Sequence, residues 1–88
     1  MESRKFTIVN KLGLHARAAA AFVQAASKFS SEIWVEKDDV EVNGKSIMGL
    51  MMLAAEQGSS INVRSEGKDN IEAMNTLEEL VANGFGEE

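Results

Sequence analysis

The sequence predicts an α+β fold in which three helices cover one face of a four-stranded antiparallel sheet. Two patterns along the 88 residues support this prediction. Four short stretches alternate apolar and polar residues, as half-buried strands do, and three longer stretches carry apolar residues at helical spacing. Their order is β-α-β-β-α-β-α, which fits helices packed on one side of an antiparallel sheet. The first six elements also match the ferredoxin-like pattern, and the order alone does not separate the two folds.

The first strand is expected at residues 4–9, where Phe6 and Ile8 share one face. A loop over residues 10–13 then leads to an alanine-rich helix at about residues 16–27, because alanine has the highest helix propensity. The apolar stripe of this helix should face the sheet. Its members are Ala19, Phe22, Val23 and Ala26.

The second and third strands are expected at residues 31–36 and 40–43, joined as a hairpin by a turn at residues 37–39. The alternation directs Ile33 and Val35 inward. Trp34 then lies on the opposite face, where cross-strand packing is its expected role.

The second helix is expected to begin after Ser46, which is a good N-cap residue, and to end at Gly58. It is apolar almost all round, so spacing does not show which residues are buried. One candidate core set is Leu50, Leu53 and Ala54. The other flank is Ile47, Met48 and Met51, and methionines suit surfaces that must fit several partners.

The fourth strand is expected at residues 60–66, followed by a last helix that ends at Asn83-Gly84. Asp69 with Glu72 three residues later indicates a capping box at the start of that helix. Its expected apolar stripe is Ile71, Met74, Leu77 and Val81. Phe85 should fold back onto the core, while residues 86–88 should fray.

Length and composition narrow the possible functions. The chain, residues 1–88, is expected to form a single domain. A net charge of −5 argues against nucleic-acid binding, although Lys11, Arg17 and Lys45 are candidates for a local basic site. With no cysteine and one histidine, no zinc or thiolate metal site is expected. No signal sequence or membrane span is apparent, so a cytoplasmic location is expected.

The only histidine, His15, lies where a glycine-containing loop meets the alanine-rich helix. The first amides of a helix lack intrahelical partners, and the helix dipole adds partial positive charge there. The guanidinium of Arg17 can bind phosphate oxygens in a bidentate manner. Neutral imidazole can attack phosphorus. These features indicate a phosphoryl acceptor at His15, with the phosphate held by Arg17 and by the amides of Ala16 and Arg17. The alternative is an ordinary surface or capping histidine.

Two motifs resemble those of a known family. The run Leu12-Gly13-Leu14-His15-Ala16-Arg17-Ala18-Ala19 resembles the active-site signature of HPr, the phosphocarrier of the bacterial phosphoenolpyruvate:sugar phosphotransferase system. The run Asn43-Gly44-Lys45-Ser46-Ile47-Met48-Gly49-Leu50 resembles the second motif of that family, at the family's usual spacing. The resemblance covers essentially the whole chain. It implies the HPr-like open-faced β-sandwich, with strand order 1-4-2-3 and three helices on one face.

The resemblance also implies a function. The chain would accept a phosphoryl group from phospho-enzyme I on His15 and pass it to enzyme IIA domains for sugar uptake. It would be a covalent carrier rather than an enzyme, a monomer, and would need no cofactor or metal. Ser46 would be a regulatory site for an HPr kinase/phosphorylase. Partners would dock on Ala20, Ile47, Met48 and Met51.

One position departs from the family pattern. The family usually has proline directly after the arginine, and this chain has Ala18. Proline there pre-sets φ and removes an amide, so Ala18 should make the helix start less rigid. Two other functions remain open. One is a regulatory phosphocarrier of the nitrogen-related branch of the same system. The other is a ferredoxin-like binding module in which His15 is only a surface residue.

Overall fold

The computed structural model, which describes residues 1–87, has the predicted order of elements. A short 3-10 helix, η1, follows the last α-helix. The elements are β1 Glu2–Thr7, α1 Ala16–Ala26, β2 Glu32–Lys37, β3 Val40–Asn43, α2 Ile47–Met52, β4 Ser60–Glu66, α3 Asn70–Ala82 and η1 Gly84–Gly86. All neighbouring strands are antiparallel, in the order β1-β4-β2-β3. This confirms the strand order that the resemblance implied.

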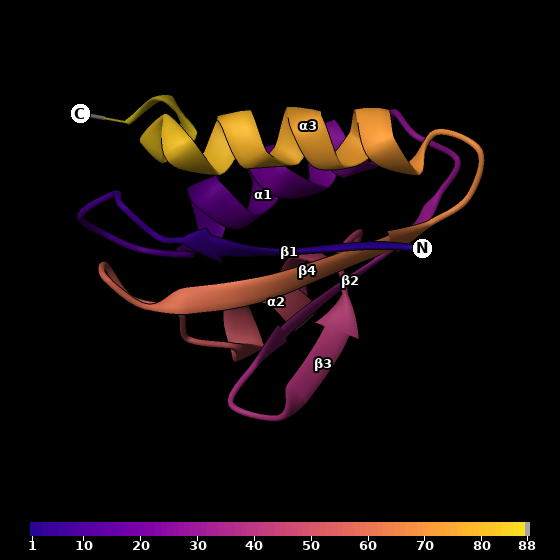
Figure 1. Ribbon diagram of the computed structural model, residues 1–88. Helices are drawn as coiled ribbons and strands as arrows, with labels where there is room; N and C mark the ends of the chain where they lie inside the picture. Colours follow the sequence, from indigo (N-terminus) through magenta and orange to yellow (C-terminus); the bar gives the residue numbers. More distant parts are fainter. Residues whose placement is uncertain (88) are drawn as a thin grey trace.

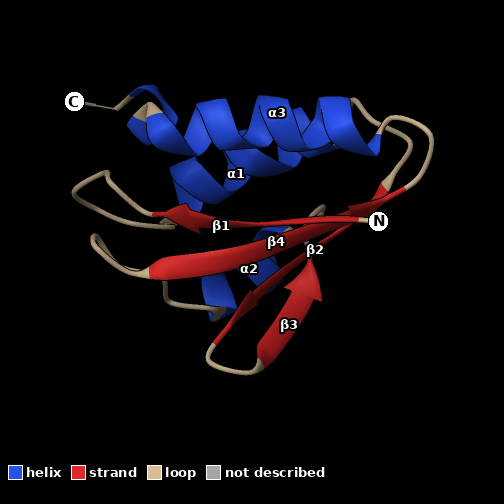
Figure 2. Cartoon of the chain, viewed as in Figure 1, coloured by secondary structure: helices blue, strands red, loops and turns tan. Residues whose placement is uncertain are grey.

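The helices form one layer against the sheet. α1 packs between α2 and α3, while α3 contacts β1 and β4, and α2 contacts β3. Figures 1 and 2 show α3 and α1 above β1, with α2 drawn behind β4. The opposite face of the sheet is open, and there the guanidinium of Arg64 lies 4.7 Å from the centre of the Trp34 ring. Trp34 therefore has the cross-strand packing role that the alternation predicted.

The core lies between the helix layer and the sheet, as predicted. Most of the side chains expected to face inward are buried. They are Phe6, Ile8, Ala19, Phe22, Ala26, Ile33, Val35, Leu50, Leu53, Met74, Leu77, Val81 and Phe85. Ile61 and Val63 of β4 are buried with them. Val23 is only partly buried, and Ala18 is fully buried in addition.

The strand boundaries differ slightly from those predicted. β1 ends at Thr7 rather than residue 9, although the Ile8 amide still donates to the Ser59 carbonyl at 2.9 Å. β2 begins and ends one residue later than expected. The hairpin turn is made by Asp38 and Asp39, with φ of 52° and 68°. Two consecutive left-handed residues are typical of a two-residue hairpin loop, whose twist matches that of the strands.

α2 is shorter than predicted. It ends at Met52 with Leu53 as C-cap, and Ala54 then turns the chain with φ of 50°, so the prediction that Gly58 ends this helix was wrong. A tertiary contact is the reason, since the Ala55 carbonyl accepts the Leu14 amide at 2.9 Å. Ala54 is consequently exposed and Ala55 buried, which corrects the prediction that Ala54 belongs to the core.

The start of α3 also differs. Asp69 makes no side-chain cap bond to its own helix, so the predicted capping box is wrong. Its carboxylate instead accepts the amides of Ser30 and Ser31, at 2.9 and 3.0 Å, and the Ser31 hydroxyl. Asp69 thus ties α3 to the segment before β2. Ile71 was expected in the core but is 50% exposed, and Ala73 is buried in its place.

Candidate functional site

His15 is the N-cap residue of α1, with extended backbone angles of φ −76° and ψ 180°. Its carbonyl accepts the Ala19 amide at 2.8 Å, but its side chain makes no cap bond to the helix. Within residues 1–87, the amides of Ala16 and Arg17 donate no hydrogen bond. The first turn of α1 therefore presents free donors at the positive end of the helix, which is where an anion is stabilised.

The loop before His15 is fixed by close backbone contacts. Gly13 has φ of 66°, and a Cβ at this position would collide with the carbonyl of Ala55. Only glycine fits such an approach without strain. Leu14 is buried and donates its amide to Ala55, and the Asn10 side-chain amide donates to the Gly13 carbonyl at 2.8 Å. The backbone that carries His15 is thereby held against the segment after α2.

The imidazole is partly exposed, with 26% of the side chain accessible, and it contacts the carboxylate of Glu87. Nε2 of His15 lies 2.5 Å from Oε2 of Glu87. The other carboxylate oxygen, Oε1, accepts the Asn10 side-chain amide at 3.0 Å. The prediction that residues 86–88 fray is wrong for Glu87, while Glu88 lies outside the described residues.

Three consecutive left-handed residues bring Glu87 to the site. Gly84, Phe85 and Gly86 have φ of 62°, 59° and 76°, and they turn the chain back after α3. Phe85 is only 9% exposed and anchors this turn in the core. No sequence pattern pointed to Asn10 or Glu87. The one available signal was the pair of glycines around Phe85, which allows such a turn.

The charges around the imidazole are mixed. Partial burial raises the pKa of Glu87, but hydrogen bonds from Asn10 and His15, with the charges of His15 and Arg17, outweigh this effect and lower the pKa overall. Arg17 and Glu87 both line an open hollow of about 440 Å³ beside the site, together with Lys11, Leu12 and Gly86. The site therefore combines a permanent positive charge with a carboxylate close to the ring.

Lys45 is not part of this basic site. Its Nζ donates at 2.7 Å to the carbonyl of Phe29, which follows the C-terminal end of α1. His15 lies at the other end of that helix. The candidate basic site therefore consists of Lys11 and Arg17 alone.

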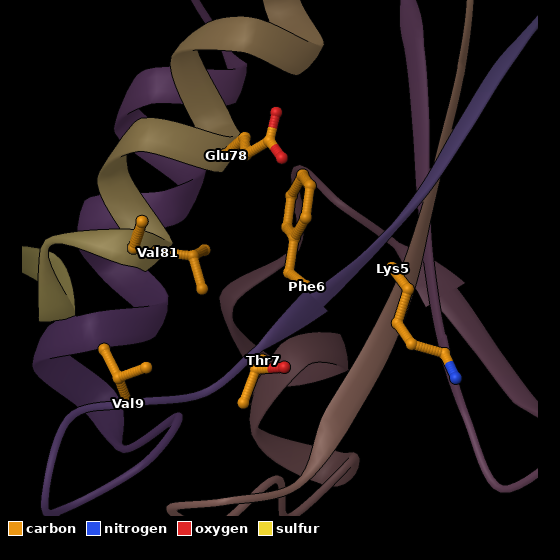
Figure 3. Close-up of a pocket in the computed structure, with 7 residues that line it drawn as sticks. Lys5, Phe6, Thr7, Val9, Glu78 and Val81 are labelled. Atoms are coloured by element: carbon orange, nitrogen blue, oxygen red, sulfur yellow. The ribbon is translucent and has the colours of Figure 1, made fainter.

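A second hollow does not resemble a reaction site. It lies between β1 and α3 and measures about 210 Å³ (Figure 3). Its lining residues are Lys5, Phe6, Thr7, Val9, Glu78, Val81 and Ala82. Neither His15 nor Arg17 lines it. Within residues 1–87, no three histidine, aspartate or glutamate side chains gather as metal ligands would. No helix in the same residues is both long and apolar enough to cross a membrane.

Helix α2, whose buried side the sequence did not reveal, presents one flank to solvent. Leu50 and Leu53 are buried, whereas Ile47, Met48 and Met51 are 41%, 76% and 43% exposed. Met52, which the sequence did not single out, is also exposed. Ala20, on α1, is half-buried. Exposed apolar side chains on one flank of a helix are a candidate interaction surface.

Ser46 is the N-cap of α2, as predicted. Its hydroxyl accepts the Gly49 amide at 3.0 Å. Ser46 lies between β3 and the first residue of α2. Ala55, beyond the other end of this helix, contacts the loop that carries His15. The two candidate phosphorylation sites therefore flank opposite ends of α2.

Comparisons with known proteins show which family the chain resembles. A family model described as the PTS HPr component phosphorylation site matches residues 2–83. The protein named phosphocarrier protein HPr from Neisseria meningitidis serogroup B is 55% identical, covering 99% of this chain and 98% of its own. A crystal structure of HPr from Thermoanaerobacter tengcongensis is 55% identical, with a TM-score of 0.96 and coverage of 100% and 99% of the two chains.

A more distant relative is dimeric. The catabolite repression protein Crh of Bacillus subtilis is 43% identical, with a TM-score of 0.77 and coverage of 96% and 97%. Its crystal structure shows a domain-swapped dimer. On the match over nearly the whole chain, the two motifs and the shared fold, the chain belongs to the HPr family of phosphocarrier proteins of the phosphotransferase system.

Proposed function

We propose that His15 is the phosphoryl acceptor of this phosphocarrier. The observation that carries the proposal is the position of His15 at the N-cap of α1, partly exposed and making no cap bond of its own. The amides of Ala16 and Arg17 are then free to bind phosphate oxygens, and Arg17 adds a permanent charge. The adduct stays at the surface, where a second protein can take it.

The contact with Glu87 indicates which nitrogen reacts. Nε2 is engaged by the carboxylate, so Nδ1 keeps the free lone pair. In an in-line transfer this pair forms the new nitrogen–phosphorus bond, while the bond to the donor breaks and its electron pair returns to the donor. Such a reaction requires mainly positioning and charge stabilisation, so we infer a carrier without a cofactor or metal.

We infer the partners from the family. Phospho-enzyme I would donate the phosphoryl group and enzyme IIA domains would accept it in the cytoplasm, for sugar uptake. The exposed flank of Ile47, Met48 and Met51, with Ala20, would be the docking surface. A regulatory carrier of the nitrogen branch has the same site, so only transfer to the respective acceptor domains separates these two functions.

We propose Ser46 as the regulatory site of the same protein. A phosphate at a helix N-terminus is stabilised by the dipole, so α2 need not unfold when Ser46 is modified by an HPr kinase/phosphorylase. It would place roughly two negative charges directly before the docking flank. Transfer to a partner with an acidic surface would then slow.

We propose that the carrier works as a monomer, because one chain contains the complete site. The dimeric Bacillus relative is the specific reason to measure this. Light scattering across a concentration series gives the mass, and a stable dimer would overturn this part of the proposal.

The function is tested by intact mass measurement after incubation with phosphoenolpyruvate and enzyme I. We expect one phosphoryl group on the wild type and none on His15→Ala. The label should be acid-labile and base-stable, as a phosphoramidate is, whereas an acid-stable label would indicate an ester. A label that persists in His15→Ala would show that another residue is the acceptor.

A further inference from the structure

The carboxylate of Glu87 is held on both of its oxygens. Oε2 lies 2.5 Å from Nε2 of His15, and Oε1 accepts the Asn10 amide at 3.0 Å. Asn10 is itself only 6% exposed, and the same side-chain nitrogen donates to the Gly13 carbonyl in the His15 loop. A hydrogen-bonded chain therefore runs from the loop through Asn10 and Glu87 to the ring.

A carboxylate in this position acts on the chemistry of the ring. By accepting a hydrogen bond from Nε2–H, it fixes the tautomer and orientation of the imidazole, as carboxylates do for histidine ligands and bases. When Nδ1 attacks phosphorus, the ring gains positive charge, and a carboxylate on Nε2 stabilises that charge without taking the proton.

We propose that Glu87, oriented by Asn10, is a positioning residue that holds the Nε2–H of His15 and stabilises the ring as Nδ1 accepts the phosphoryl group. This inference rests on the proposed function of His15. In the opposite role, the Glu87 carboxylate would be a competing anion that occupies the place of the phosphate beside Arg17. The geometry favours positioning, because Glu87 contacts Nε2, the nitrogen across the ring from the one left free.

The two roles predict opposite rates with a small donor that needs no docking. Phosphoramidate transfers its phosphoryl group to imidazoles, so it reports on the site alone. We expect Glu87→Gln to lower the initial rate about tenfold, as loss of one hydrogen bond to a charged group does. Glu79→Gln is the matched control, since Glu79 is an exposed α3 carboxylate outside the chain of hydrogen bonds to His15, and it should react like the wild type. An equal or faster rate in Glu87→Gln would overturn the proposal.

A second readout separates positioning from a merely structural role. Long-range ¹⁵N NMR of the neutral His15 ring should show the proton on Nε2 in the wild type and a mixture of tautomers in Glu87→Ala. Unchanged tautomers would contradict the inference. Failure of the proposed function is distinguishable, because His15→Ala would then still accept a phosphoryl group from phosphoramidate.

The part played by Asn10 is measured with a double-mutant cycle. Asn10→Ala should slow phosphorylation by phosphoramidate when it is introduced into the wild-type chain. It should cause little further slowing in Glu87→Gln, since both changes break the same chain of hydrogen bonds. Equal slowing in both backgrounds would show that Asn10 does not act through Glu87.

Discussion

Ala54 adopts φ of 50° where the chain leaves α2, in the left-handed region that costs an L-residue roughly 1–2 kcal/mol. Its side chain is exposed. Ala54→Gly should raise the free energy of unfolding by roughly 0.5–1 kcal/mol, because the relief of strain exceeds the extra entropy of glycine in the unfolded chain. Urea denaturation measures the change. Ala25→Gly, inside α1, is the control and should lower stability; a lower stability of Ala54→Gly as well would contradict the strain at this residue.

The same residue shows where local sequence stops being informative. Gly58 was the expected end of α2 because glycine commonly follows a helix, yet the left-handed turn falls on Ala54. The cause is the bond between Leu14 and Ala55, which are 41 positions apart. His15 and Ser46, by contrast, were predictable at their positions, since each precedes a helix that its own neighbours specify.

At the scale of elements, Asp69 joins α3 to the segment before β2. Hydrogen bonds from the Ser31 hydroxyl and the Ser30 amide lower the pKa of Asp69 from 3.8 to about 2. A carboxyl group whose pKa is lower in the folded state than in the unfolded state stabilises the fold at pH values above its unfolded pKa. This stability is lost as the pH falls through the folded pKa. Asp69→Asn should therefore destabilise the protein at neutral pH, with the difference from wild type shrinking as the pH falls from about 4 to about 2.

Urea midpoints measured across that pH range test this linkage. Glu72→Gln, an exposed change in the first turn of α3, serves as the control and should not show the same convergence in that window. A constant difference between Asp69→Asn and the wild type down to pH 2 would mean that ionised Asp69 does not hold the two elements together.

Asp69 also shows why the position at which α3 begins was predicted correctly although the predicted capping interaction was wrong. The helix begins at Asn70, close to the expected position, but the carboxylate bonds to residues 38 and 39 positions away instead of capping its own helix. A capping box and a tertiary bond use the same residue types. Spacing along the chain does not distinguish them.

At the scale of the whole molecule, the topology gathers the site from three distant segments. The loop between β1 and α1 and the C-terminal turn lie at the same end of the molecule (Figure 1). The segment after α2 joins them through Ala55. The sequence predicted that His15 lies at the free end of a helix, which is a local feature. Glu87 was not predictable, because its contact with His15 spans 72 positions and depends on the turn at Phe85.

The exposed flank of α2 gives the last prediction. Met48 is 76% exposed, so Met48→Glu should leave the fold intact, while it adds a charge to the proposed docking surface. We expect transfer from phospho-enzyme I to fall about tenfold, as for loss of a central interface residue. Phosphorylation by phosphoramidate should not change, because that donor does not dock.

Ile71→Glu is the matched control, since Ile71 is an apolar residue of α3 that is 50% exposed and lies outside the proposed docking surface. It should transfer at the wild-type rate with both donors. If Met48→Glu also matched the wild type with phospho-enzyme I, the apolar flank of α2 would not be where partners bind. If both variants slowed equally, the loss would reflect charge added anywhere on this acidic protein rather than a contact at Met48.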